Sequence, residues 1–185
     1  MRKQLYSMSF EDAVLRELSI ERDAEEVVKT TVNLPYWMYV SVELLHFEED
    51  IATNKLYTGI VNHGTAIIQH RFGDELDAQR QIRSKILRSD DEHDIGYLLD
   101  FKVLGNKTFA NPRKRNLSIP EWCMQYLGRF SGAFPIKYST AIRLSMMYSL
   151  LKWENITERC ANNCVEETKA FESGVNKYMQ VINIL

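Results

Sequence analysis

The sequence contains no apolar run that approaches the roughly 20 residues of a transmembrane helix. Its first residues, MRKQL, lack the apolar stretch that marks a secretion signal. Proline and glycine are scarce, at four and eight of 185 residues, whereas 45% of the residues are hydrophobic. This composition argues against a disordered chain and predicts a packed core. We therefore expect a cytoplasmic protein without a membrane partner.

Cysteine is scarce as well, with Cys123, Cys160 and Cys164 only. An odd number without a secretion signal indicates reduced thiols. Cys160 and Cys164 could form half of a zinc site, but no second pair of ligands stands at metal spacing, so helix packing is the favoured interpretation. The sequence also lacks a phosphate-binding loop, a nucleophile elbow and a paired-carboxylate motif. We predict no catalytic residue, metal or cofactor, and hence no enzyme.

What the sequence does contain is a repeat. Residues 29–37 read KTTVNLPYW, and residues 114–122 read KRNLSIPEW. In each copy polar and apolar residues alternate up to a proline, which is typical of a short strand with one buried face. Proline cannot donate a hydrogen bond to a β-ladder, and its fixed φ suits the first turn of a helix. Each strand is therefore predicted to run directly into a helix.

Two helices are predicted after each strand. Apolar residues follow the two prolines at matched offsets, namely Met38, Val42 and Leu45 in one copy and Cys123, Leu127 and Phe130 in the other. The second helices are predicted to begin near Thr53 and near Tyr138. Their buried stripes are predicted to be Leu56, Ile60, Gly64 and Ile67, and Ile142, Met146, Leu150 and Trp153.

This order of strand, proline, helix, turn and helix resembles the ribbon-helix-helix family of the MetJ and Arc repressors. The resemblance covers 29–69 and 114–153. In that family two units dimerise, and their strands pair as an antiparallel ribbon above four helices. Two copies in one chain resemble the layout of the conjugation protein TraY. The resemblance implies a mainly α fold with one short two-stranded ribbon. It also implies a tandem pseudo-dimer, in which strand 29–34 pairs antiparallel with strand 114–119.

Additional helices complete the predicted architecture. They are assigned to an N-terminal extension, a connector and a C-terminal segment, at 1–28, 70–113 and 154–185. The connector is predicted to hold a separate helix over about 74–87, and its stretch 95–104 fits either a strand or a short helix. The terminal helices carry apolar residues that suit self-association or a protein partner.

The polar face of the ribbon suggests a function. A two-stranded ribbon fits the major groove of DNA, where amide, hydroxyl and ammonium groups match the pattern of the base edges. The predicted base-reading residues are Lys29, Thr31, Asn33, Lys114, Asn116 and Ser118. The second helices begin with free amides that can hold phosphate. The predicted phosphate-binding residues are Thr53, Asn54, Lys55, Arg115, Tyr138, Ser139 and Thr140.

The net charge of −2 does not oppose DNA binding, because 114–153 carry six Lys or Arg against one acidic residue. The sequence thus predicts a sequence-specific double-stranded DNA-binding protein that acts as a transcriptional repressor. Two alternatives remain open. An architectural accessory protein of a relaxosome or plasmid-partition complex would use the same ribbon and recruit partners through its terminal helices. In an antitoxin-like scaffold for protein binding, DNA binding would be secondary.

Overall fold

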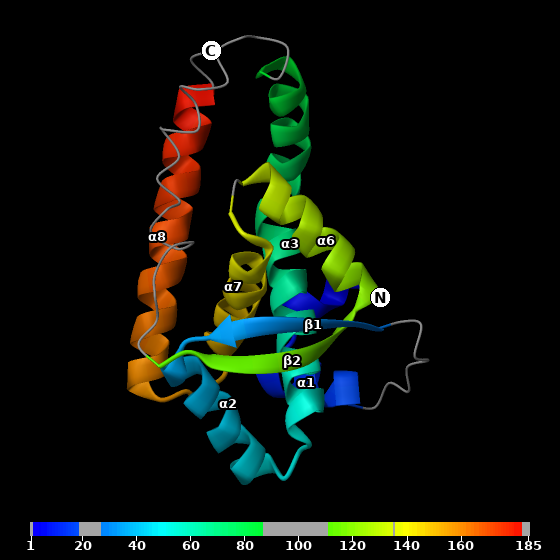
Figure 1. Ribbon diagram of the computed structural model, residues 1–185, viewed down its shortest axis with the longest axis vertical. Helices are drawn as coiled ribbons and strands as arrows, with labels where there is room; N and C mark the ends of the chain where they lie inside the picture. The colour runs from blue at the N-terminus through cyan, green and yellow to red at the C-terminus, as the bar shows by residue number, and fades with distance from the viewer. Residues whose placement is uncertain (1, 19–26, 87–110, 135, 183–185) are drawn as a thin grey trace.

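The computed structural model describes residues 2–18, 27–86, 111–134 and 136–182 (Figure 1). The alternatives for 95–104 lie outside these ranges. The described elements are a 3-10 helix η1 (Arg2–Ser7), α1 (Phe10–Leu18), β1 (Val27–Leu34), α2 (Tyr36–Glu49), α3 (Thr53–Ile86), β2 (Arg113–Pro120), α6 (Glu121–Ala133), α7 (Tyr138–Leu150) and α8 (Glu158–Ile182). The described chain is mostly helical, as expected, with one two-stranded antiparallel sheet.

Strands β1 and β2 pair with each other, which confirms the predicted antiparallel ribbon within one chain. The register places Thr31 directly opposite Asn116. Both residues stand third in their copies of the repeat. Pro35 and Pro120 then lead into α2 and α6 with φ values of −55° and −53°. The ring of proline therefore ends each strand and begins each helix, as the sequence predicts.

One face of the ribbon, here called its underside, packs against the helices and contributes to the hydrophobic core. Its buried side chains are Val32, Leu34, Leu117 and Ile119. Helices α3 and α7 pack beneath it and approach each other closely at Gly64. A Cβ atom at Gly64 would lie only 1.7 Å from the carbonyl oxygen of Ser145. Glycine is required here because any side chain would displace the backbone of α7.

The second helix of each copy is bonded to the strand of the other copy. The hydroxyl of Thr58 in α3 donates to the carbonyl of Ser118 in β2 at 2.6 Å. The guanidinium of Arg143 in α7 donates to the carbonyl of Asn33 in β1 at 3.3 Å. The two halves of the chain are therefore interlocked, since neither strand is supported only by its own helices.

Helix α3 is longer than predicted. It continues from Thr53 through Ile86, so the separate helix expected over 74–87 is the continuation of α3. The ring of Phe72 explains the continuation, because it packs edge-on against Phe171 with ring centroids 5.6 Å apart. Packing of this kind stabilises the helix beyond the core of the repeat. Helix α7 is shorter than predicted, and the buried Trp153 lies beyond its end.

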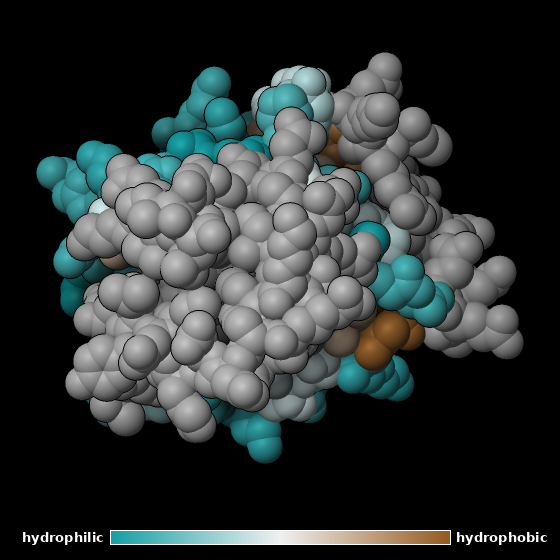
Figure 2. Space-filling view, turned by 90° about the horizontal axis from the view of Figure 1, so that it is seen from above, coloured by the Kyte–Doolittle hydropathy of each residue, from teal (hydrophilic) through white to brown (hydrophobic). Residues whose placement is uncertain are grey.

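Several apolar residues of the terminal helices pack within the chain. Ser9 caps α1 through a bond from the amide of Asp12 at 3.1 Å, and Phe10 packs against Trp153 at 5.8 Å. In α8 the buried residues include Cys160, Cys164, Phe171 and Val175. None of the helices within the described ranges is both long enough and apolar enough to cross a membrane. Seen from above, the described surface is mainly hydrophilic (Figure 2).

Candidate nucleic-acid interface

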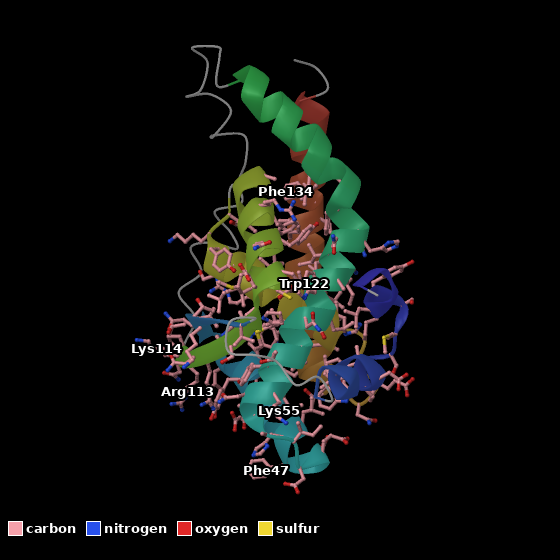
Figure 3. All side chains as sticks on the ribbon, turned by 90° about the vertical axis from the view of Figure 1, so that its right-hand side faces the viewer. Phe47, Lys55, Arg113, Lys114, Trp122 and Phe134 are labelled. Atoms are coloured by element: carbon pink, nitrogen blue, oxygen red, sulfur yellow. The ribbon has the colours of Figure 1, made fainter. Side chains whose placement is uncertain are left out.

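The six predicted base-reading residues lie on one face of the ribbon. They form three cross-strand pairs, Lys29 with Ser118, Thr31 with Asn116, and Asn33 with Lys114. Five of the six are exposed and Ser118 is half-buried. Side chains alternate between the two faces of a strand, so these residues point away from the buried underside. Figure 3 shows Lys114 at the outer edge of the molecule, directed away from the helices.

The charged side chains of this face are all positive. The face carries two ammonium groups, from Lys29 and Lys114, and neither strand contains an acidic residue. At its centre the hydroxyl of Thr31 donates to the amide oxygen of Asn116 at 2.9 Å, which orients that amide. The face therefore combines a locally positive potential, which attracts a polyanion, with hydrogen-bonding groups of fixed direction.

Arg115 belongs to the other face of the ribbon. Its guanidinium lies 4.5 Å from the ring centroid of Tyr39 and forms an ion pair with Glu43. The side chain is 34% exposed. Burial raises the pKa of the neighbouring Tyr57 to about 12, and the charge of Arg115 acts in the opposite direction. Arg115 thus joins β2 to α2, and this contact competes with the predicted role at phosphate.

Arg113 is a further basic residue at the start of β2 that is not among the predicted site residues. It is exposed, and its guanidinium lies 5.5 Å from the ring centroid of Tyr36. Figure 3 shows it beside Lys114, at the same edge of the molecule. Side chains alternate between the two faces of a strand, so positions 113 and 115 share the inner face and Lys114 lies on the outer face. This alternation could have distinguished the two arginines from Lys114 in the sequence.

The start of α3 keeps three of the predicted phosphate-binding residues accessible. Asn54 and Lys55 are exposed, and Thr53 is half-buried. The amides of Lys55 and Leu56 both donate to the carbonyl of Ala52, at 2.9 and 3.1 Å. The amides of Thr53 and Asn54 precede these bonds and are the ones that can face an anion.

The start of α7 is more enclosed than predicted. Thr140 is buried, its amide donates to the carbonyl of Lys137 at 2.8 Å, and its hydroxyl accepts from Arg143 at 2.9 Å. The hydroxyl of Tyr138 donates to the sulfur of Met124 at 2.6 Å, and burial raises the pKa of this tyrosine to about 12. The amides of Tyr138 and Ser139 remain, together with the exposed Lys137, which the sequence reasoning missed.

The two helix starts lie on opposite sides of the ribbon. Figure 1 views the ribbon face-on, with the start of α3 below it and the start of α7 above it. The positive ends of both helix dipoles therefore flank the polar face. An extended anion that lies along the polar face can therefore be bound by the start of α3 on one side of the ribbon and by the start of α7 on the other.

Comparisons with protein-family models, with curated proteins and with solved structures found no match to this chain. Among the residues that the structure describes, no group of three or more His, Cys, Asp or Glu could hold a metal ion. All three cysteines are buried as free thiols. The ribbon face is accordingly the feature on which a functional assignment has to rest.

Proposed function

We propose that the protein binds double-stranded DNA by inserting the β1–β2 ribbon into the major groove, and that it acts as a sequence-specific transcriptional repressor. The observation that carries the proposal is the polar face of the ribbon, with two lysines, two asparagines, no acid and a buried apolar underside. The major groove admits a two-stranded ribbon, and each base pair presents a distinct donor and acceptor pattern there.

The proposal includes a tandem ribbon-helix-helix arrangement, in which the two copies act as the two halves of a dimer. Three contacts support it, because each joins equivalent places of the repeat or recurs in both halves. The first is the pair Thr31 and Asn116. The second is His63 with Ser149 at 3.1 Å, each seven residues beyond the first stripe residue of its helix. The third is the reciprocal bonding of α3 to β2 and of α7 to β1.

Base reading is assigned to the side chains of this face. Lysine ammonium groups favour guanine O6 and N7, and asparagine amides can form two bonds to adenine. Asn33 and Asn116 differ in their surroundings, because Asn33 stands opposite Lys114 whereas Asn116 accepts a bond from Thr31. The two halves of the target therefore need not be identical.

Phosphate binding is assigned to the helix starts and the nearby cations. The proposed groups are the amides of Thr53, Asn54, Tyr138 and Ser139, and the side chains of Lys55 and Lys137. These contacts set the position of the ribbon on the duplex and carry no sequence information. Arg115 is not included, because its guanidinium is engaged with Glu43 and Tyr39.

Selection of bound sequences from random duplex DNA tests the proposal. We expect an enriched motif for the parent protein, and no enrichment for a Lys114→Glu variant. Lys169→Glu on α8 is the matched control, because it changes the charge equally at another exposed lysine. Binding without enrichment would favour an architectural accessory protein. No binding at all by the folded parent at low salt would overturn the assignment to DNA.

A further inference from the structure

Helix α2 presents a row of apolar side chains on its outer surface. The row consists of Tyr36, Val40, Leu44 and Phe47, here called the α2 stripe. Residues at these spacings lie along one side of a helix. Tyr36 is 47% exposed, Leu44 41% and Phe47 79%, and Val40 is half-buried. Figure 3 shows Phe47 at the far end of α2, directed away from the rest of the protein.

The equivalent face of α6 is polar. At the same offsets from its proline α6 carries Glu121, Gln125, Arg129 and Gly132. The amide of Gln125 donates to Glu121 at 3.1 Å along this face. The two helices have the same place after their strands, so the fold does not require an apolar outer surface there. Contiguous exposed apolar side chains in a globular protein mark a contact surface.

We propose that the α2 stripe binds the α2 stripe of a second copy of this chain, with the two helices antiparallel about a two-fold axis. The order of the side chains is the first argument. It reads aromatic, aliphatic, aliphatic, aromatic, and is therefore the same in both directions. An antiparallel pair places Tyr36 against Phe47 of the partner and Val40 against Leu44 of the partner. A two-fold interface requires a self-complementary surface of this kind.

Charge at the two ends of the stripe is the second argument. Beside Tyr36 stands the exposed guanidinium of Arg113, 5.5 Å from the ring centroid. Beyond Phe47 stand the exposed acidic residues Glu48, Glu49 and Asp50. In an antiparallel pair the basic end of each copy meets the acidic end of the other, whereas a parallel pair would place like charges together.

The size of the stripe sets the strength that we expect. From Tyr36 to Phe47 it spans about 17 Å at 1.5 Å per residue. A contact of this length belongs to the small end of specific interfaces, so we expect a weak, concentration-dependent dimer. The proposal concerns the protein alone and does not rest on DNA binding.

Sedimentation equilibrium of the full chain without DNA tests the proposal. We expect the parent to dimerise reversibly as its concentration rises from micromolar to millimolar. The neutral substitution Phe47→Gln should weaken the dimer about 10-fold or more, because it removes the most exposed aromatic ring of the stripe. Gln125→Ala on α6 is the matched control and should leave the dimer unchanged. A monomeric parent over the whole range, or a Phe47→Gln variant that dimerises like the parent, would overturn the proposal.

Charge reversal tests the antiparallel arrangement. Glu48→Lys and Arg113→Glu should each weaken the dimer, because each places like charges across the interface. The double variant restores an opposite pair and should recover the affinity of the parent to within about threefold. Circular dichroism establishes that each variant is folded. If the double variant is no better than the weaker single variant, the antiparallel arrangement is wrong.

Discussion

Helices α2 and α6 follow the two prolines in the same way but differ on their outer surfaces. On the inner side both are buried, through Met38, Val42 and Leu45 in α2 and through Cys123, Leu127 and Phe130 in α6. On the outer side α2 is apolar and α6 is polar. The comparison shows that the inner and outer surfaces of such a helix are subject to different requirements. The inner residues serve the fold, and the outer residues are free to serve a second purpose.

The same comparison applies to the second helices, α3 and α7. At equivalent places along their buried stripes, α3 has Gly64 and α7 has Leu150. The halves are therefore not interchangeable where the helices cross, because Gly64 alone permits the backbone of α7 to approach. The predictions below test such differences, from the largest expected effect to the smallest.

The largest effect is expected at the helix crossing. Gly64→Ala places a Cβ atom 1.7 Å from the carbonyl oxygen of Ser145, so the two helices must separate. We expect a loss of about 3 kcal/mol or more in the free energy of unfolding. Urea denaturation measures it. Gly73→Ala in the same helix is the control, since nothing lies within 4 Å of its added Cβ, and it should stabilise by about 0.5–1 kcal/mol. An equal response of both variants would contradict the close crossing.

The next effect concerns His63, which faces Ser149 across the crossing at 3.1 Å. Burial lowers the pKa of His63 from 6.5 to about 4, and the charge of Lys152 acts in the same direction. Below pH 6.5 the unfolded chain takes up a proton that the folded chain does not. Stability is therefore complete above pH 6.5 and falls as the pH is lowered toward 4, by on the order of 3 kcal/mol.

Denaturation of the parent and of His63→Gln across this pH range measures the effect. The variant should lose the part of the pH dependence that His63 contributes, whatever its stability at neutral pH. If the parent and the variant show the same slope between pH 6.5 and 4, His63 is not buried in its neutral form.

The two asparagines test base reading in the two halves. Asn33→Ala and Asn116→Ala should each lower the affinity for the preferred duplex by about 1–3 kcal/mol and relax the preference at one base pair. Binding to a scrambled duplex should hardly change. Thr31→Val removes the hydroxyl that orients Asn116, so it should weaken the half-site of Asn116 as well as the position that Thr31 itself reads. If both asparagine variants bind the preferred site as the parent does, the ribbon does not read the bases.

The smallest effects are expected at the helix starts. Lys55→Ala at α3 and Lys137→Ala at α7 should weaken binding to all sequences alike. Each should flatten the slope of log K against log salt by roughly 0.9, the value for one lost phosphate contact. Titrations at several salt concentrations measure the slope.

Arg115→Ala should instead reduce the free energy of unfolding, because it breaks the pair with Glu43. A lower salt slope for Arg115→Ala without a loss of stability would restore its predicted role at phosphate.

Much of the secondary structure could be predicted because it is a local property. The period of two in each strand, the proline and the helical stripes lie within short stretches, and the structure follows them. The six polar residues of the ribbon were found in the same way, since alternation alone places them on one face. The continuation of α3 was missed, because it depends on Phe72, which packs against rings from other parts of the chain.

The candidate site was predicted less completely at its edges. Arg115 was assigned to phosphate because it is basic and near a strand, but its partner Glu43 stands 72 positions away in sequence. Thr140 was assigned to phosphate, but it is buried and its hydroxyl accepts a hydrogen bond from Arg143. The contact of Arg115 joins residues far apart in sequence and cannot be read from the local pattern, whereas the contact of Thr140 with Arg143 spans three positions of one helix and is local.

The sequence by itself determined where the two strands lie, where the helices after them begin and which face of each is apolar, because these properties repeat over a few residues. Only the tertiary structure decided that Thr31 faces Asn116, that Gly64 admits Ser145 and that the apolar outer face of α2 stays uncovered. The physical reason is distance along the chain. Residues such as Thr31 and Asn116 stand 85 positions apart, and their alignment follows from the joint packing of both copies.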